Sequence, residues 1–223
     1  MTASRISARS LLRETFANLG SRYAPLLLIN SPILIFVGLN NFGKLGSAGV
    51  AFNIIYWFVV VPLLSGAMIF YTYRSLTKNQ VTVGQSLAQS NRRLLQIITV
   101  NIICLLLVCA GFIALIIPGF YVSYRLMFSS YATVIDNSSA LDSVSSSWEL
   151  TQGRWWLVFR STLLIIFVVF VPILLICLLI DPTGKSVAYQ LAANLLGFLA
   201  GPSINVYFVL LYQRLRESVA ATQ

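Results

Sequence analysis

Apolar residues gather along the chain in runs that are each close to the length of a membrane span. A helix needs about 20 apolar residues to cross the hydrocarbon core of a bilayer. Short segments richer in polar and charged residues separate the runs. We therefore predict about six transmembrane helices, at residues 24–40, 48–73, 97–117, 119–135, 155–180 and 187–212.

The first run is interrupted by Asn30, Ser31 and Pro32. Proline inside a helix removes a backbone hydrogen bond and clashes with the preceding turn. The pattern predicts that the first span is kinked or partly broken at this point.

Residues 97–135 are apolar almost throughout and are too long for one span. A single helix of this length would extend about 58 Å, against a hydrocarbon core of about 30 Å. Pro118 and Gly119 lie at the midpoint, and Pro followed by Gly is favoured at the centre of a type II turn. We expect a hairpin of two spans, whose turn is either a plain one at the outer interface or a re-entrant one lining a cavity.

Amphipathic segments precede the pairs of spans. In the first, apolar residues recur at helical spacing and a basic stripe repeats every four residues, through Arg5, Arg9 and Arg13. This pattern is typical of a helix that lies in the membrane interface with its basic side chains toward the headgroups. We predict such an interfacial helix at residues 5–21, with weaker versions at about 82–96 and 140–154.

These three segments indicate an internal repeat. Its units would be three helices each followed by a hairpin, near 1–78, 79–135 and 136–223, all in the same orientation. Apolar sequences also resemble one another by chance, and that alternative stays open.

Composition supports the membrane assignment. Hydrophobic residues make up 58% of the chain and charged residues 9%, whereas a soluble domain carries about 25% charged residues. The net charge is +9, and the arginines lie beside apolar runs, so the expected anionic partner is the lipid headgroup layer rather than nucleic acid. The sequence predicts one all-α polytopic membrane domain over residues 1–223.

The distribution of basic residues predicts the topology. With six spans, Lys44 and Lys185 are the only basic residues in the outer loops. The positive-inside rule then places both termini in the cytoplasm, with no cleaved signal peptide, in a bacterial inner membrane. The basic residues at the cytoplasmic ends are Arg5, Arg9, Arg13, Arg22, Arg74, Lys78, Arg92, Arg93, Arg154, Arg160, Arg214 and Arg216.

Side chains for catalysis are scarce. The chain holds no histidine, and its cysteines, Cys104, Cys109 and Cys177, fall in apolar runs without metal-ligand spacing. No nucleophile has a nearby base, and no phosphate-cradling loop is present. We therefore expect no catalytic residues, no metal site and no cofactor.

Arg125 is the one charge placed well inside a predicted span. It lies about 9 Å past Gly119 at helical rise, and a charge at such depth is a functional candidate. It could pair with helix carbonyls, Asn101, Asn205 or a lipid phosphate, or it could snorkel to the outer headgroups. Together with Arg5, Arg9, Arg13 and Arg154 it forms the predicted lipid or substrate contact.

Aromatic residues are expected to anchor the cytoplasmic interface, namely Trp148, Trp155, Trp156 and Tyr212.

Two stretches carry a family resemblance. Residues 117–121 read Ile-Pro-Gly-Phe-Tyr, Arg125 follows, and residues 142–156 read Asp-Ser-Val-Ser-Ser-Ser-Trp-Glu-Leu-Thr-Gln-Gly-Arg-Trp-Trp. With the ending Leu-Tyr-Gln-Arg-Leu-Arg-Glu at 211–217, this resembles the YciC-like membrane family, which is related to the membrane domain of some glycerophosphodiester phosphodiesterases. Ser145 and Ser146 depart from the family, where basic residues usually flank the Ser-Trp pair. The resemblance implies a membrane fold without an agreed activity, and we expect no phosphodiesterase barrel in this protein.

These observations favour a non-enzymatic membrane protein that supports envelope or lipid organisation, or the assembly of another membrane complex. Its expected partners are anionic lipids and a partner membrane protein. The alternative is a channel or carrier for a small or lipidic solute, which Arg125, the broken first span and the repeat would suit.

Overall fold

The computed structural model describes residues 7–42, 48–77 and 80–221, apart from the side chains of Ser21, Asn41, Phe42 and Ala48. This part of the chain is helical throughout and contains no strand. The elements are α1 (Ala8–Asn30), α2 (Pro32–Phe42), α3 (Ala48–Ile55), the π-helical turn η1 (Tyr56–Val60), α4 (Val61–Leu76), α5 (Val83–Arg92), α6 (Leu94–Ala114), α7 (Ile116–Leu126), α8 (Ser129–Ile135), α9 (Ala140–Leu150), α10 (Trp155–Ile180) and α11 (Val187–Ala220).

Five segments of the described chain are long and apolar enough to cross a membrane. They confirm the predicted all-helical class, with one candidate span fewer than the six expected. The segments are Arg22–Asn40, Gly49–Leu76, Leu94–Ala114, Trp155–Ile180 and Val187–Ala220.

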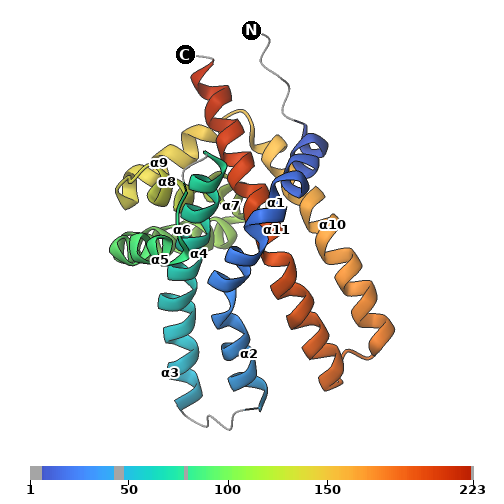
Figure 1. The fold of residues 1–223 in the computed structure, drawn as a ribbon. Coiled ribbons are helices and arrows are strands. Elements are labelled where there is room, and N and C mark those ends of the chain that lie inside the picture. Colours follow the sequence, from blue (N-terminus) through green and yellow to red (C-terminus); the bar gives the residue numbers. More distant parts are fainter. Residues whose placement is uncertain (1–6, 43–47, 78–79, 222–223) are drawn as a thin grey trace.

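The long helices run lengthwise through the molecule, while α5 to α9 gather beside α4 in the half that holds the chain ends (Figure 1). The start of α1 and the end of α11 lie at one end. The connection between α10 and α11 lies at the other end, as do the end of α2 and the start of α3. The two described ends of the chain therefore lie at the same end of the molecule.

Helix α11 is the centre of the packing. The Tyr23 hydroxyl of α1 donates to the Leu199 carbonyl (3.0 Å), and the Thr72 hydroxyl of α4 donates to the Asn205 side chain (2.7 Å). The Tyr207 hydroxyl donates in turn to the Ser161 carbonyl of α10 (3.0 Å). In an apolar stretch of 18 residues within α11, 50% of the residues are buried, against 11% in the corresponding stretch of α10. The rest of the protein therefore leaves most of α10 uncovered.

The first span is broken where the sequence predicted. Helix α1 ends at Asn30, the Ser31 amide donates to the Leu28 carbonyl (3.3 Å), and α2 begins at Pro32. The interfacial helix predicted at 5–21 is not a separate element, because α1 runs without interruption from Ala8 into the span; residues 5 and 6 lie outside the described chain. Packing of Leu11 and Thr15, both fully buried, holds this amphipathic part in line with the bundle.

The turn predicted at Pro118 and Gly119 is wrong. The helix is interrupted at Leu115 instead, where the backbone is extended (φ −167°, ψ 158°). Pro118 and Gly119 both lie inside α7. Proline is tolerated in the first turn of a helix, where its missing N–H has no intrahelical partner to lose. Gly119 serves a different purpose: a Cβ there would lie 2.5 Å from the Phe112 ring of α6. The hairpin of α6 and α7 exists, with glycine used for its close packing.

The span predicted at 119–135 is also not a single helix. Helix α7 has 11 residues and α8 has 7, so α7 rises only about 16 Å. Ile117 and Pro118 line one groove with Trp155 and Phe159, which belong to the first turns of the 26-residue α10. The tip of the hairpin thus lies beside the start of α10, far from the connection at 181–186.

That connection is held by the Asp181 carboxylate. It accepts hydrogen bonds from the Thr183 hydroxyl (2.7 Å) and from the amides of Thr183 (2.9 Å) and Ser186 (2.7 Å), which hold the pKa of Asp181 well below its usual range. Gly184 takes the left-handed conformation that the turn requires (φ 69°).

Candidate functional site

Among the described residues, most arginines form no ion pair with a carboxylate. All six acidic residues are described. Glu14 and Glu217 pair with Arg214 (3.1 and 3.4 Å), and Asp136 pairs with Arg216 (2.6 Å). The other three accept hydrogen bonds from residues nearby in sequence, in α9 and its N-cap or in the loop before α11. Within the described chain the arginines without a carboxylate partner include Arg9, Arg74, Arg92, Arg125 and Arg160.

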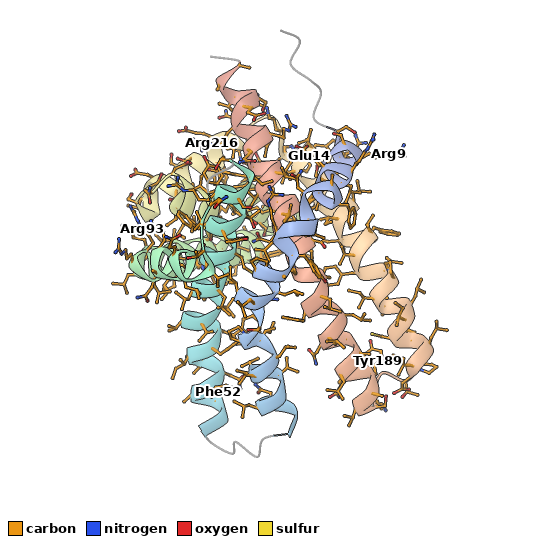
Figure 2. All side chains as sticks on the ribbon, in the orientation of Figure 1. Arg9, Glu14, Phe52, Arg93, Tyr189 and Arg216 are labelled. Carbon is orange, nitrogen blue, oxygen red and sulfur yellow. The ribbon has the colours of Figure 1, made fainter. Side chains whose placement is uncertain are left out.

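A groove between α1 and α10 brings two of these arginines together. Arg9 and Arg160 line it with Leu163, Leu164 and Phe167, and its volume is about 490 Å³. The three apolar residues follow Arg160 at one and two helical turns, so they continue the same face of α10. Phe167 is 69% exposed. Arg9 lies at the end of the molecule that holds the chain termini (Figure 2).

The groove is amphipathic along its length. Two guanidinium groups lining one groove repel each other, and an anion between them turns this repulsion into attraction. Guanidinium groups bind phosphate oxygens through paired, charge-assisted hydrogen bonds. Beyond Arg160 along α10, the side chains that line the groove are all apolar. A ligand with a phosphate at one end and a hydrocarbon chain below it matches this arrangement.

The remaining arginines of the predicted contact are placed differently. Arg5 lies outside the described residues, and Arg13 is exposed on α1 but does not line the groove. Arg154 donates to the Ser218 carbonyl (3.3 Å) near the end of α11. Arg160 was missed as a contact residue. Its spacing to Leu163, Leu164 and Phe167 was the signal in the sequence that could have identified it.

Arg125 is buried at the corner where α7, α9 and α10 meet. Only 3% of its surface is exposed, and its Cζ lies 4.3 Å from the centre of the Trp148 ring and 5.6 Å from that of Tyr121. Its Nε has no hydrogen-bond partner among the described residues. The expected amide partners are engaged elsewhere, Asn101 by Ser130 (2.9 Å) and Asn205 by Thr72 (2.7 Å). Snorkelling to the headgroups and pairing with these amides are therefore both wrong; aromatic faces hold this cation.

Serine and threonine hydroxyls fix α9, and thereby Trp148, against α7 and α8. The Ser147 hydroxyl donates to the Arg125 carbonyl (2.8 Å) and accepts from the Phe128 amide (3.1 Å). The Thr133 hydroxyl donates to that of Ser143 (2.8 Å). Because Ser143 and Ser147 are fully buried, small side chains let α9 approach closely and bring the Trp148 ring over the guanidinium group.

A second groove adjoins this corner. It lies between α7 and α10, has a volume of about 690 Å³ and exposes only apolar surface. Tyr121 belongs to both features, since its ring contacts Trp148 and Trp155 (centroids 6.1 and 5.8 Å apart) and lies under Arg125. The arrangement places a buried cation behind one wall of an apolar groove.

The predicted aromatic anchors divide into two groups. Trp148, Trp155 and Trp156 are 39%, 37% and 53% exposed, as an interfacial position would require. Tyr212 is only 2% exposed, and its hydroxyl donates to Asp136 (2.6 Å), which also binds Arg216. Its assignment as an interface anchor is wrong, because it belongs to an internal network that joins α8 to α11.

Residues 79–215 match the family described as Domain of unknown function (DUF7847), over more than half of the chain. The chain belongs to this family. Comparison with curated proteins and with solved structures finds no match. The DUF7847 segment contains the whole Arg125 corner and the α10 side of the amphipathic groove, whereas Arg9 and α1 precede it. The corner is thus built entirely from the family domain, and the amphipathic groove only in part.

Proposed function

We propose that this protein is a non-enzymatic multi-pass membrane protein that holds anionic lipids at its surface. Through these lipids it supports lipid organisation in the envelope or the assembly of another membrane complex. The proposal places it in a bacterial inner membrane, with the end that carries Arg9, Arg214 and Arg216 in the cytoplasm. The anionic leaflet surface there would attract these basic residues.

The groove of Arg9 and Arg160 carries the proposal. It contains two guanidinium groups that have no carboxylate partner among the described residues. It also contains an apolar face of α10, one of the two candidate spans least covered by protein. A phospholipid with an anionic headgroup satisfies both halves at once, its phosphate between the arginines and one acyl chain along Leu164 and Phe167. A zwitterionic lipid brings its own cation and gains less from the arginine pair.

We propose no catalytic step because the sequence offers few side chains for catalysis. The chain has no histidine and six acidic residues, and these carboxylates already pair with arginines or hold turns and helix ends. A supporting role that uses bound lipid to seat a partner protein needs only exposed apolar and basic surface, which α10 and α1 provide.

A second candidate is a carrier for a lipidic solute. The observation that favours it is the apolar groove between α7 and α10, with Arg125 uncompensated behind Tyr121. Vesicles containing the purified protein and a fluorescent lipid distinguish the two functions. Translocation of the lipid between leaflets would support the carrier, and stable binding without translocation supports the role proposed first.

The test of lipid binding is a double substitution, Arg9→Gln with Arg160→Gln. Each arginine near an anionic surface contributes about 1 kcal/mol, so the affinity for phosphatidylglycerol should fall by about 30-fold. Native mass spectrometry of the full chain in detergent, titrated with phosphatidylglycerol or phosphatidylcholine, measures the change. Binding of phosphatidylcholine should stay the same.

Lys185→Gln is the matched control, since it removes a positive charge at the opposite end of the molecule. It should leave phosphatidylglycerol binding at the parent level. An unchanged affinity in the double variant would show that the groove is not an anionic lipid site.

A further inference from the structure

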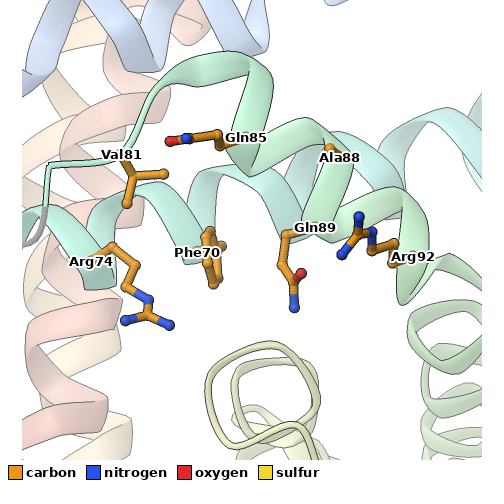
Figure 3. Close-up of a pocket in the computed structure, with 7 residues that line it drawn as sticks. All are labelled: Phe70, Arg74, Val81, Gln85, Ala88, Gln89 and Arg92. Atoms are coloured by element: carbon orange, nitrogen blue, oxygen red, sulfur yellow. The ribbon is translucent and has the colours of Figure 1, made fainter.

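A pocket between α4 and α5 contains two further arginines without a carboxylate. Arg74 and Arg92 enter it from opposite ends, with Phe70 and Gln89 between them (Figure 3). Its volume is about 330 Å³. The pocket is separate from the groove between α1 and α10 and shares no residue with it.

The pocket is built on two elements that are firmly joined. The Ser90 hydroxyl of α5 donates to the Leu63 carbonyl of α4 (2.7 Å), and Ser86 and Ser90 are buried between the helices. A Cβ at Gly66 would lie 2.5 Å from the Ser90 hydroxyl oxygen, so only glycine allows this approach. A capping box of Thr82 and Gln85 fixes the start of α5. The arginines therefore project from a rigid base.

Four residues of α5 face the pocket at helical spacing: Gln85, Ala88, Gln89 and Arg92. From α4, Phe70 forms a wall and the Arg74 guanidinium lies 5.3 Å from the centre of its ring. The pocket thus offers two guanidinium groups and the Gln89 amide as donors, beside an aromatic face. All of the charged groups that line it are positive.

The charges of the pocket call for an anion. The six carboxylates of the chain lie elsewhere, in pairs with Arg214 and Arg216 or in turns of their own. A planar guanidinium binds phosphate oxygens in a bidentate manner, and two long arginine side chains that converge on one phosphate group can share its oxygens. The volume suits a headgroup-sized ligand rather than a whole lipid with its acyl chains.

We propose that this pocket binds a phosphate group between Arg74 and Arg92, with the Gln89 amide as a further donor. The group belongs either to a phospholipid headgroup or to a soluble phosphate. Arg74 lies in the last turn of the α4 span, so the pocket is at the end of this span and open to either source. The inference does not rest on the function proposed above, because different arginines on different helices carry it.

The experiment measures the reactivity of individual arginines. The full chain in detergent is treated with phenylglyoxal, and peptide mass spectrometry gives the modification rate at Arg74 and Arg92, both of which are exposed. Phosphatidylglycerol, diacylglycerol and inorganic phosphate are added in separate arms. Two charge-assisted contacts should slow modification of both arginines by about tenfold in an arm that supplies the phosphate.

The arms separate the sources. Protection by phosphatidylglycerol alone identifies a lipid headgroup, and protection by inorganic phosphate as well identifies a site for soluble phosphate. Diacylglycerol lacks the phosphate and should protect neither arginine. Equal protection by diacylglycerol, or no protection in any arm, would overturn the proposal.

Two variants complete the test. In Arg92→Gln, phosphatidylglycerol should no longer protect Arg74, because one phosphate requires both donors. Arg160→Gln is the matched control and should leave the protection of Arg74 and Arg92 intact, even where it abolishes binding in the other groove. Persistent protection of Arg74 in Arg92→Gln would show that the two arginines do not share a ligand.

Discussion

A buried cation held only by aromatic rings is the unusual residue of this structure. Arg125 lies over Trp148 and Tyr121, and no described carboxylate or amide reaches its guanidinium group. Desolvation of an arginine costs free energy that the ring quadrupoles offset in part, by about 2 kcal/mol at a desolvated site. Its remaining hydrogen-bonding capacity makes it the residue on which the carrier alternative depends.

A double-mutant cycle tests this contact. Trp148→Leu should destabilise the parent protein more than it destabilises an Arg125→Met variant, because without this ring the buried charge keeps only the more distant Tyr121 ring. The coupling free energy should be about 1–2 kcal/mol. Unfolding of the full chain in mixed detergent and denaturant, followed by circular dichroism, measures it.

Trp156→Leu serves as the control, because Trp156 stacks on Phe159 and does not contact Arg125. Its effect should be the same in both backgrounds. A coupling near zero for Trp148 would mean that the ring contributes only packing.

At the scale of elements, hydroxyl-bearing and small residues decide how the amphipathic segments dock. Helix α5 is fixed on α4 through Ser90 and Gly66, and α9 on α7 and α8 through Ser143 and Ser147. In a low-dielectric interior each such hydrogen bond satisfies a polar group that would otherwise be costly to bury. These segments thus pack against protein rather than lying freely on the membrane surface.

Gly66→Ala should loosen α5. The new Cβ would displace the Ser90 hydroxyl from the Leu63 carbonyl and push the end of the Ile97 side chain, for a loss of about 1–2 kcal/mol. The expected readout is faster amide hydrogen exchange over residues 83–92.

Gly197→Ala is the matched control, since no atom lies within 4 Å of a Cβ there. It should leave exchange unchanged. If Gly66→Ala exchanged at the parent rate over α5, the close approach of the two helices would not contribute to stability.

At the scale of the whole molecule, we expect the position of the α6–α7 hairpin to set the number of membrane crossings. Its tip lies beside Trp155 and Phe159, in the half that contains both described chain ends (Figure 1). Four of the five candidate spans run lengthwise as two pairs, and α6 begins beside α5 within that half. If the α6–α7 hairpin enters and leaves the membrane on the same side, the two ends of the chain can lie on one side of the membrane without six full crossings.

Cysteine labelling tests this topology. In a variant without Cys104, Cys109 and Cys177, an impermeant maleimide should reach Thr183→Cys from one side of membrane vesicles and Gln80→Cys from the other. Leu115→Cys should not react from the side that labels Thr183→Cys, because the hairpin tip lies near the start of α10. Labelling of both from the same side would restore the model of six full spans.

Local signals in the sequence determined the chemistry of the chain and most of its elements. Composition and run length predicted an all-helical fold with helices long and apolar enough to span a membrane, since backbone groups in lipid must be satisfied within the helix. Pro32 correctly placed the break in the first span, because proline ends a helix through its own ring and missing donor. The family resemblance drawn from residues 117–156 and the internal repeat stay predictions.

Tertiary structure decided the features that depend on distant residues. Pro118 has the sequence of a turn but lies in a helix, because glycines and the Phe112 ring allow α6 and α7 to pack with the break at Leu115. Tyr212 has the sequence context of an interface anchor, but its ring is buried and its hydroxyl donates to Asp136, 76 residues away. The arginines of both proposed anion sites come from separate helices. Charge composition alone predicted an anionic partner. Only the packed fold brings Arg9 beside the same groove as Arg160, and Arg74 beside the same pocket as Arg92, because contacts between distant segments have no local signature in the sequence.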